Sequence, residues 1–176
     1  MWLDDEELDL IARRGSTIVT NPVSNMKLAV GRAFPYPAAE RTGIPIGIGT
    51  DGVASNNSLD LLADVKILAL LQKHTEGDPK VLSAADAWAI ATGARAPLLG
   101  GTRMAVGAPA DFLLVDAQTA EMTPAPLVDA LVYSGSGAVV HTTVVDGVVL
   151  MHDRRIDGEA EIRTRAAEAA RRVRTT

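Results

Sequence analysis

The 176-residue sequence contains no cysteine, which excludes disulfides, thiolate zinc sites, iron–sulfur clusters and cysteine nucleophiles together. It has only two Phe, two Trp and two Tyr, and its 22 acidic residues outnumber its 17 basic ones. Nucleic-acid binding calls for basic surface and stacking aromatic side chains. We therefore expect no nucleic-acid partner.

Long hydrophobic runs are also missing. No apolar stretch approaches the ~18 residues that a membrane span needs, and residues 1–14 lack the basic start and apolar run of a signal peptide. We expect a cytoplasmic protein with no membrane partner. With 47% hydrophobic and 22% charged residues, the chain can bury a sizeable core.

The first hundred residues alternate between helical and strand patterns. Asn21-Pro22 ends the first β-branched run, and residues 23–34 are expected to form a loop. The expected helices cover residues 5–14, 37–42, 59–74 and 84–92, and the expected strands cover 16–20 and 44–50. This alternation predicts an α/β fold, in which reacting groups lie at the carboxyl ends of strands.

The pattern changes beyond Gly101. β-branched runs at 112–116, 138–147 and 148–152 predict a small sheet, with Asp146-Gly147 as a hairpin turn. From about Glu159 the chain is helical again, with Glu/Arg pairs at four-residue spacing. We therefore expect two domains, an α/β region over 1–100 and a β-rich module with a C-terminal helix over 101–176.

Asp51 is the strongest candidate for a catalytic residue. It follows a buried strand, and small residues around it leave room for a ligand to approach the backbone. The alternative is that Asp51 only begins a turn or caps nearby amides. The residues alone leave both interpretations open.

Polar side chains flank this position on two segments. Ser24 and Asn25 lie after the first strand, and Ser55 and Asn56 follow Asp51. All four could line one ligand mouth at the carboxyl ends of the strands. Turn and cap chemistry explains them about equally well.

Two other site types find little support. Gly47, Gly49 and Gly52 match the G-x-G-x-x-G pattern of dinucleotide-binding loops, but a carboxylate inside that loop would repel a pyrophosphate. The histidines at 74, 141 and 152 fall in no metal-ligand spacing and are expected to be structural or solvated. A catalytic metal needs three or four ligands, so Asp51 alone cannot hold one tightly.

Three stretches occur in a characteristic order: NPVSNMKLAVG, GIGTDGVASNNSLDLLADVKILALLQK and GTRMAVGAPADFLLVD. Together they resemble the C-terminal part of the metal-dependent amidohydrolase superfamily, nearest to methylthioadenosine/S-adenosylhomocysteine deaminases and triazine chlorohydrolases. The resemblance implies the C-terminal portion of a (β/α)8 TIM barrel, about strands seven and eight with their helices. A small β-sandwich module and a C-terminal helix would follow.

By this resemblance Asp51 is a metal ligand that also accepts the proton of the attacking water, and Ser24, Asn25, Ser55 and Asn56 lie around the substrate. The implied cofactor is a divalent metal, zinc most of all, with iron possible. The implied substrate is a small heterocycle, a purine-like or triazine-like ring that loses ammonia or chloride. A homo-oligomer would also be in keeping with the family.

The family's histidine ligands have no counterpart here, and Thr20 stands where members commonly carry His. We therefore expect the chain to be a C-terminal fragment of a hydrolase, inactive alone and unable to bind metal tightly. The alternative is a non-catalytic remnant or interaction module that needs a partner chain.

Overall fold

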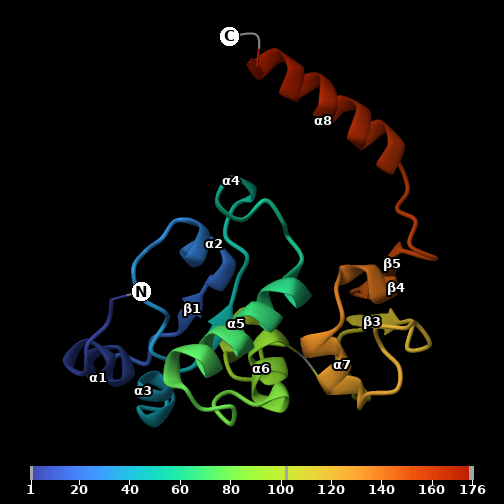
Figure 1. Ribbon diagram of the computed structural model, residues 1–176. Coiled ribbons are helices and arrows are strands. Elements are labelled where there is room, and N and C mark those ends of the chain that lie inside the picture. Colours follow the sequence, from blue (N-terminus) through green and yellow to red (C-terminus); the bar gives the residue numbers. More distant parts are fainter. Residues whose placement is uncertain (1, 102, 175–176) are drawn as a thin grey trace. The chain divides into compact units, whose positions relative to one another are not determined.

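The computed structural model describes residues 2–101 and 103–174 and divides into two compact units (Figure 1). Unit 1 comprises Met1–Thr102 with Ala117–Val139, and unit 2 comprises Arg103–Asp116 with Val140–Thr176. The expected division near residue 100 differs from these units in segment 117–139, which groups with unit 1. In the described ranges no helix combines the length and apolar character needed to cross a membrane.

Unit 1 contains the α/β alternation. Its elements in chain order are α1 (Asp5–Arg13), β1 (Ile18–Thr20), α2 (Pro22–Lys27), α3 (Tyr36–Arg41), β2 (Ile46–Ile48), α4 (Val53–Asn56), α5 (Leu61–Glu76), α6 (Ala84–Ala91), η1 (Pro97–Leu99), α7 (Leu127–Tyr133) and η2 (Gly137–Val139). The expected helices and strands of the first hundred residues are confirmed within a few residues. Three short helices, α2, α4 and α7, were not expected.

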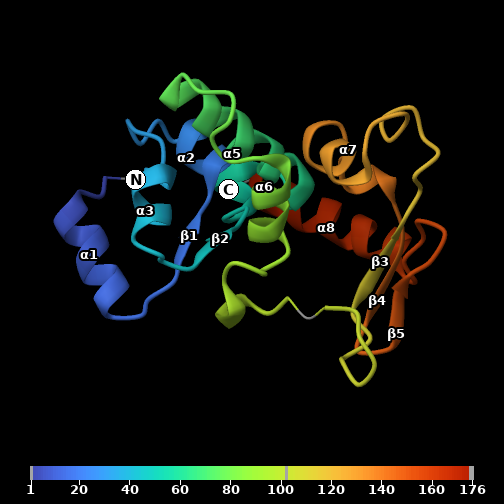
Figure 2. The same ribbon diagram turned by 90° about the horizontal axis from the view of Figure 1, so that it is seen from below.

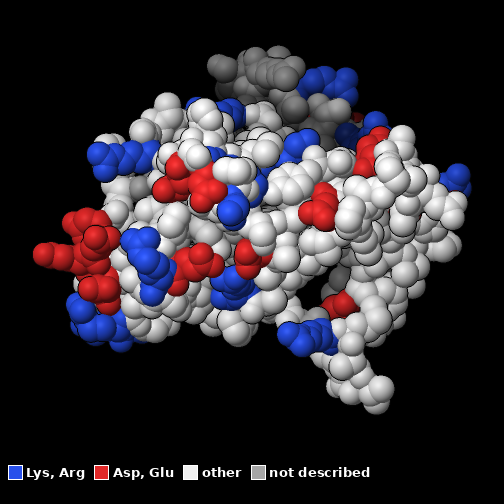
Figure 3. Space-filling view, turned by 60° about the horizontal axis from the view of Figure 1, so that its bottom comes forward, with Lys and Arg blue, Asp and Glu red and all other residues white. Residues whose placement is uncertain are grey.

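The first helix shows how local sequence sets an element's start. Asp4 accepts a hydrogen bond from the backbone N–H of Glu7, and Glu7 accepts one from the backbone N–H of Asp4, at 2.9 and 3.0 Å. This capping box satisfies two amides that the first turn leaves unpaired. Figure 3 shows the acidic side chains gathered at α1, where they complement the positive end of the helix dipole.

The expectation of a loop over 23–34 was wrong for residues 23–27, which belong to α2. Pro22 does end β1, but it also occupies the first turn of α2, where a missing N–H breaks no helical hydrogen bond. The sequence signal for the end of the strand was therefore also the signal for the start of a helix. As a result, Ser24 lies on a short helix immediately after β1.

β1 and β2 pair in parallel, with Ile18 opposite Ile46 and Thr20 opposite Ile48 (Figure 2). These four side chains are buried, whereas Val19 is 36% exposed on the opposite face. The buried face packs into a core with residues of α5 and α6, among them Val65, Leu68, Ala87 and Ile90. This packing fixes the carboxyl ends of both strands, where the candidate site lies.

Helix α7 explains why segment 117–139 groups with unit 1. It packs on α5 and α6 and buries Ala130, Leu131 and Val132. Within unit 1, Asp60 links segment 117–139 to α5. Its carboxylate accepts the N–H of Leu62 at the start of α5 and also accepts the N–H of Gly137, the latter at 2.8 Å.

Unit 2 is an antiparallel sheet in the order β3 (Phe112–Val115), β4 (Val140–Val145) and β5 (Val148–Met151), followed by α8 (Glu159–Arg174). The expected hairpin is confirmed, because Asp146 and Gly147 both have positive φ, at 50° and 75°, as a type I′ turn requires. The Asp111 carboxylate accepts the Asp146 N–H at 2.6 Å and anchors this turn.

Candidate functional site

Asp51 lies just beyond the carboxyl end of β2, and its side chain is exposed. Its backbone has φ +59°, in the left-handed region that residues with a Cβ rarely adopt. Its Oδ1 accepts the Gly52 N–H at 2.7 Å, and its Oδ2 accepts the Ser24 hydroxyl, also at 2.7 Å. Two donors thus fix a carboxylate that still has acceptor positions open to solvent.

Ser24 reaches Asp51 because β1 and β2 are parallel neighbours whose carboxyl ends lie side by side. Ser24 is 1% exposed, so its hydroxyl is held in place by packing. Gly49 leaves room for the side chain of Asn21 at the end of β1, because a Cβ at that position would lie 2.6 Å from the Asn21 Oδ1. Ser24 and Asp51 therefore lie on the same face, at the carboxyl ends of the two strands, as the sequence analysis expected.

The hydrogen bonds from Ser24 and then from the Gly52 amide hold the pKa of Asp51 below its usual range, and the nearby Ser55 hydroxyl adds to this effect. Each donor stabilises the ionised form. At neutral pH Asp51 is therefore a carboxylate, able to bind a cation or to accept a proton.

Ser55 and Asn56, both on α4, have different surroundings. The Ser55 hydroxyl lies beside Asp51 and also donates to the Gly52 carbonyl at 3.0 Å. Asn56 is buried, and its amide nitrogen donates to the Thr50 carbonyl at 2.8 Å and to Asp64 Oδ2 at 2.9 Å. Asn56 thus connects the loop of Asp51 to α5.

Asp64 lies behind the loop of Asp51, and the sequence analysis did not single it out. It is 1% exposed on α5, and burial raises its pKa, while the hydrogen bonds from Asn56 and from the Val23 N–H act in the opposite direction. Through these two donors Asp64 connects the Asp51 loop with the start of α2.

Asn25 does not join this group. It lines a separate cavity with Met26 and Phe34, between α2, the following loop and α5. The neighbouring Lys27 ties α2 to the Asp51 loop instead, donating to the Ala54 carbonyl at 3.2 Å and to Asn57 Oδ1.

In the described residues no group of three or more His, Cys, Asp and Glu side chains could hold a metal ion. His74 lies in the last turn of α5, and the other two histidines belong to unit 2. There Thr142 contacts Nδ1 of both His141 and His152, at 2.8 and 3.3 Å. Asp51 fits a divalent metal as one oxygen ligand, but the described residues place no two further His, Cys, Asp or Glu ligands of a tight site beside it.

This geometry does not favour a dinucleotide-binding loop at Gly47, Gly49 and Gly52. The helix that follows Gly47, Gly49 and Gly52 has only four residues, and the carboxylate of Asp51 occupies the loop. A pyrophosphate site needs a loop free of negative charge at the N-terminus of a helix.

Comparisons with known proteins agree with the resemblance. A 5'-deoxyadenosine deaminase of Methanoregula boonei is 47% identical over 175 residues, which make up 98% of this chain and 40% of the relative. A 5-methylthioadenosine/S-adenosylhomocysteine deaminase of Thermococcus onnurineus is 42% identical over 159 residues, covering 89% of this chain and 37% of the relative. The chain therefore spans about two fifths of the length of the curated relatives it matches.

Solved structures with bound zinc also match this chain. An adenosine deaminase from Xanthomonas campestris with bound zinc matches with a TM-score of 0.91 at 34% identity, over 99% of this chain and 41% of that chain. Atrazine chlorohydrolase from Arthrobacter aurescens complexed with zinc matches with a TM-score of 0.80 at 26% identity, over 97% and 39%. The mixed α/β fold is thus that of amidohydrolase structures.

The predicted family is confirmed by a further match, since the model described as "Amidohydrolase family" covers residues 1–150. That range includes β1, β2, the Ser24–Asp51 hydrogen bond and most of the sheet of unit 2. The chain belongs to the amidohydrolase family.

Proposed function

We propose that this chain is the C-terminal portion of a metal-dependent hydrolase of non-peptide C–N bonds, an aminohydrolase of a purine-like or triazine-like ring. The observation that carries the proposal is the Ser24–Asp51 hydrogen bond at the carboxyl ends of two parallel strands, in a chain whose relatives are named deaminases. In this proposal β1 and β2 correspond to about strands seven and eight of a (β/α)8 barrel. Unit 2 corresponds to the sandwich module with its C-terminal helix.

Asp51 would hold the metal and accept a proton. When bound, a divalent metal, zinc first and iron second, supplies the Lewis acidity that makes water a nucleophile at neutral pH. The lowered pKa of Asp51 keeps its carboxylate ionised, as metal binding and proton acceptance both require, although the same shift makes it a weaker base. Ser24 would keep the carboxylate oriented, because its buried hydroxyl has a fixed position.

The polar residues around Asp51 would have different roles toward the substrate. Ser55 is half-buried beside Asp51, which suits a contact with substrate. Ser24 and Asn56 would act on the substrate through Asp51 and its loop, because their polar groups are already hydrogen-bonded there. Asn25 lines the separate cavity, so a substrate contact from it is the least supported of the four.

The 176-residue chain alone would be inactive and would hold metal weakly, because one carboxylate cannot replace a complete ligand set. The alternative of a module that needs a partner chain draws on a different observation. Unit 1 exposes large apolar side chains, including Val53 at 60% and Leu59 at 68%, beside a sheet of two strands. In this alternative a partner chain would cover these side chains.

The first test is the intact mass of the native gene product in its source cells, compared with 18.5 kDa for this chain. We expect a mass well above twice that value, because the relatives are about two and a half times as long. A product of 18.5 kDa would favour the partner-dependent module, and size-exclusion chromatography would then show whether a second chain accompanies it.

The second test uses the native-length product. Replacement Asp51→Asn should abolish ammonia release from 5'-deoxyadenosine and reduce zinc content, whereas Asp9→Asn, at an exposed acid on α1, should change neither. Full activity in Asp51→Asn would refute the assigned role. Ammonia release with stoichiometric zinc by the 176-residue chain alone would refute its expected inactivity.

A further inference from the structure

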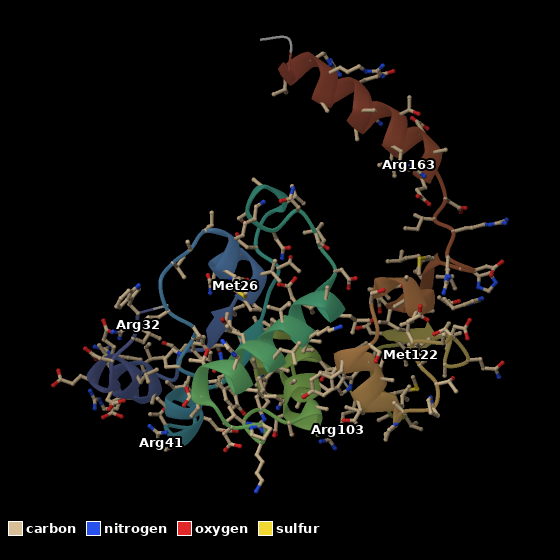
Figure 4. The ribbon with its side chains drawn as sticks, in the orientation of Figure 1. Met26, Arg32, Arg41, Arg103, Met122 and Arg163 are labelled. Atoms are coloured by element: carbon tan, nitrogen blue, oxygen red, sulfur yellow. The ribbon has the colours of Figure 1, made fainter. Side chains whose placement is uncertain are left out.

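Helix α2 holds the loop of Asp51 at two places, and the proposed chemistry uses only one of them. Helices α2 and α4 are in contact, and Met26 marks α2 in Figure 4. At the start of the loop, the Ser24 hydroxyl donates to Asp51 at 2.7 Å. At the other end, the Lys27 ammonium donates to the Ala54 carbonyl at 3.2 Å. The second contact is separate from the first, because a different side chain makes it and it meets the opposite end of the loop.

The second contact completes the carboxyl end of α4. The last carbonyls of a helix have no partner within it, and this end of a helix carries a partial negative charge. None of the four residues of α4 is basic. Lys27 supplies both a donor and a positive charge from α2, since it donates to the Ala54 carbonyl and to Oδ1 of Asn57, the residue that caps the helix. Lys27 therefore fixes the position at which α4 ends.

The loop needs such support because the backbone is strained at both of its ends. Asp51 and Asn57 have φ of +59° and +70°, in the left-handed region that residues with a Cβ rarely adopt. Such conformations persist where the surrounding contacts hold them. Each of the two side chains accepts a hydrogen bond from α2, the first from Ser24 and the second from Lys27. Helix α2 therefore holds both strained positions of the loop, and Ser55 lies between them.

We propose that Lys27 is a positioning residue, which holds the carboxyl end of α4 and so keeps Ser55 in place beside Asp51. The inference rests on the proposed function, in which Ser55 contacts the substrate. Asp51 itself stays oriented without Lys27, because the Ser24 hydroxyl and the Gly52 amide still donate to it. Loss of the ammonium should therefore weaken substrate binding and leave the chemical step almost unchanged.

Amide hydrogen exchange of the 176-residue chain, followed by NMR, tests the structural step without any need for activity. Lys27→Met keeps the aliphatic stem and removes the ammonium. In this variant the amides of Asn56 and Asn57 should exchange at least about tenfold faster, because their backbone hydrogen bonds in α4 open more often, while amides of α5 should be unaffected. The matched control is Lys80→Met, at an exposed lysine before α6, which should change neither helix. Unchanged exchange in α4, or an equal acceleration in α5, would overturn the proposal.

Steady-state kinetics of the native-length product with 5'-deoxyadenosine test the functional step. Lys27→Met should raise KM at least about fivefold while kcat stays within about twofold, as expected when the substrate and the transition state lose the same binding interaction. Lys27→Arg, which keeps a positive charge and several donors, should recover most of this loss, and Lys80→Met should match the unaltered enzyme. An unchanged KM, a fall in kcat alone, or no recovery in Lys27→Arg would overturn the proposal. If the unaltered product releases no ammonia, the proposed function fails, while the exchange rates still decide whether Lys27 holds α4.

Discussion

The hydrogen bonds of Asn56 lead to a quantitative prediction about the loop that holds Asp51. Replacing Asn56 by Ala removes one bond to the Thr50 carbonyl and one to the Asp64 carboxylate, at 2.8 and 2.9 Å. A bond to a neutral group contributes about 0.5–1.5 kcal/mol and one to a charged group about 1.5–3 kcal/mol. We therefore expect Asn56→Ala to lower the free energy of unfolding by about 2–4 kcal/mol at neutral pH.

This loss should depend on pH, because Asp64 titrates. Burial raises the pKa of Asp64 in the folded state, so its contribution to stability is greatest below its unfolded-state pKa and is lost as pH rises through the folded pKa. The Asn56 amide opposes that shift. Without Asn56 the folded pKa of Asp64 rises further, and the destabilisation should therefore be smaller in acid than at neutral pH.

Urea unfolding at about pH 7 and at about pH 4, close to the usual pKa of an aspartate, measures both effects. The matched control is Asn25→Ala, which removes the same side chain from a half-buried position with no hydrogen bond to Asp64. Asp64→Asn should remove most of the pH dependence. An equal loss at both pH values, or a loss below about 0.5 kcal/mol at neutral pH, would refute the reasoning.

Three further predictions concern the core and the site. Leu68→Ala, at a 1% exposed core position, should lower the free energy of unfolding by about 2–5 kcal/mol in chemical denaturation. The control Leu70→Ala, 43% exposed on the same helix, should lower it by much less. Equal losses in the two variants would contradict the observed packing of α5. Ser24→Ala should raise the pKa of Asp51, measured by NMR titration of the carboxyl carbon, because the main donor to that carboxylate is lost; an unchanged pKa would show that the bond is not formed. Asp51→Gly should unfold at a higher temperature than Asp51→Ala, because φ is +59° there; the reverse order would argue against the left-handed backbone.

Much of this fold follows from sequence patterns because the signals are local. The helices with apolar periodicity and clear caps, such as α1 and α5, and the Asp146-Gly147 turn depend on residues close in the chain. Helix α7 lacked such a signal. It has seven residues, follows Pro126 and buries a run of apolar side chains, which sequence periodicity cannot distinguish from a strand.

The candidate site was predictable to a similar degree. The position of Asp51 after a buried strand and of Ser24 after its neighbour placed both on one edge of the sheet, and their hydrogen bond agrees with that placement. The role of Asn56 was not predictable in the same way. Its amide turns inward to Asp64, a contact that depends on where α5 packs behind the loop.

On helix α5, the spacing of polar residues along the sequence does indicate which of them face the core. Asp64, Leu68 and Gln72 are spaced by four residues, so they share one face of the helix, and all three are buried. Two polar residues on a core-facing stripe reduce stability unless each finds a partner. Asp64 finds one in Asn56 and supports the loop of Asp51, whereas Gln72 faces a cavity without one. On α5 the polar residue at core spacing that has a partner, Asp64, is thus the one that ties the helix to the loop of Asp51.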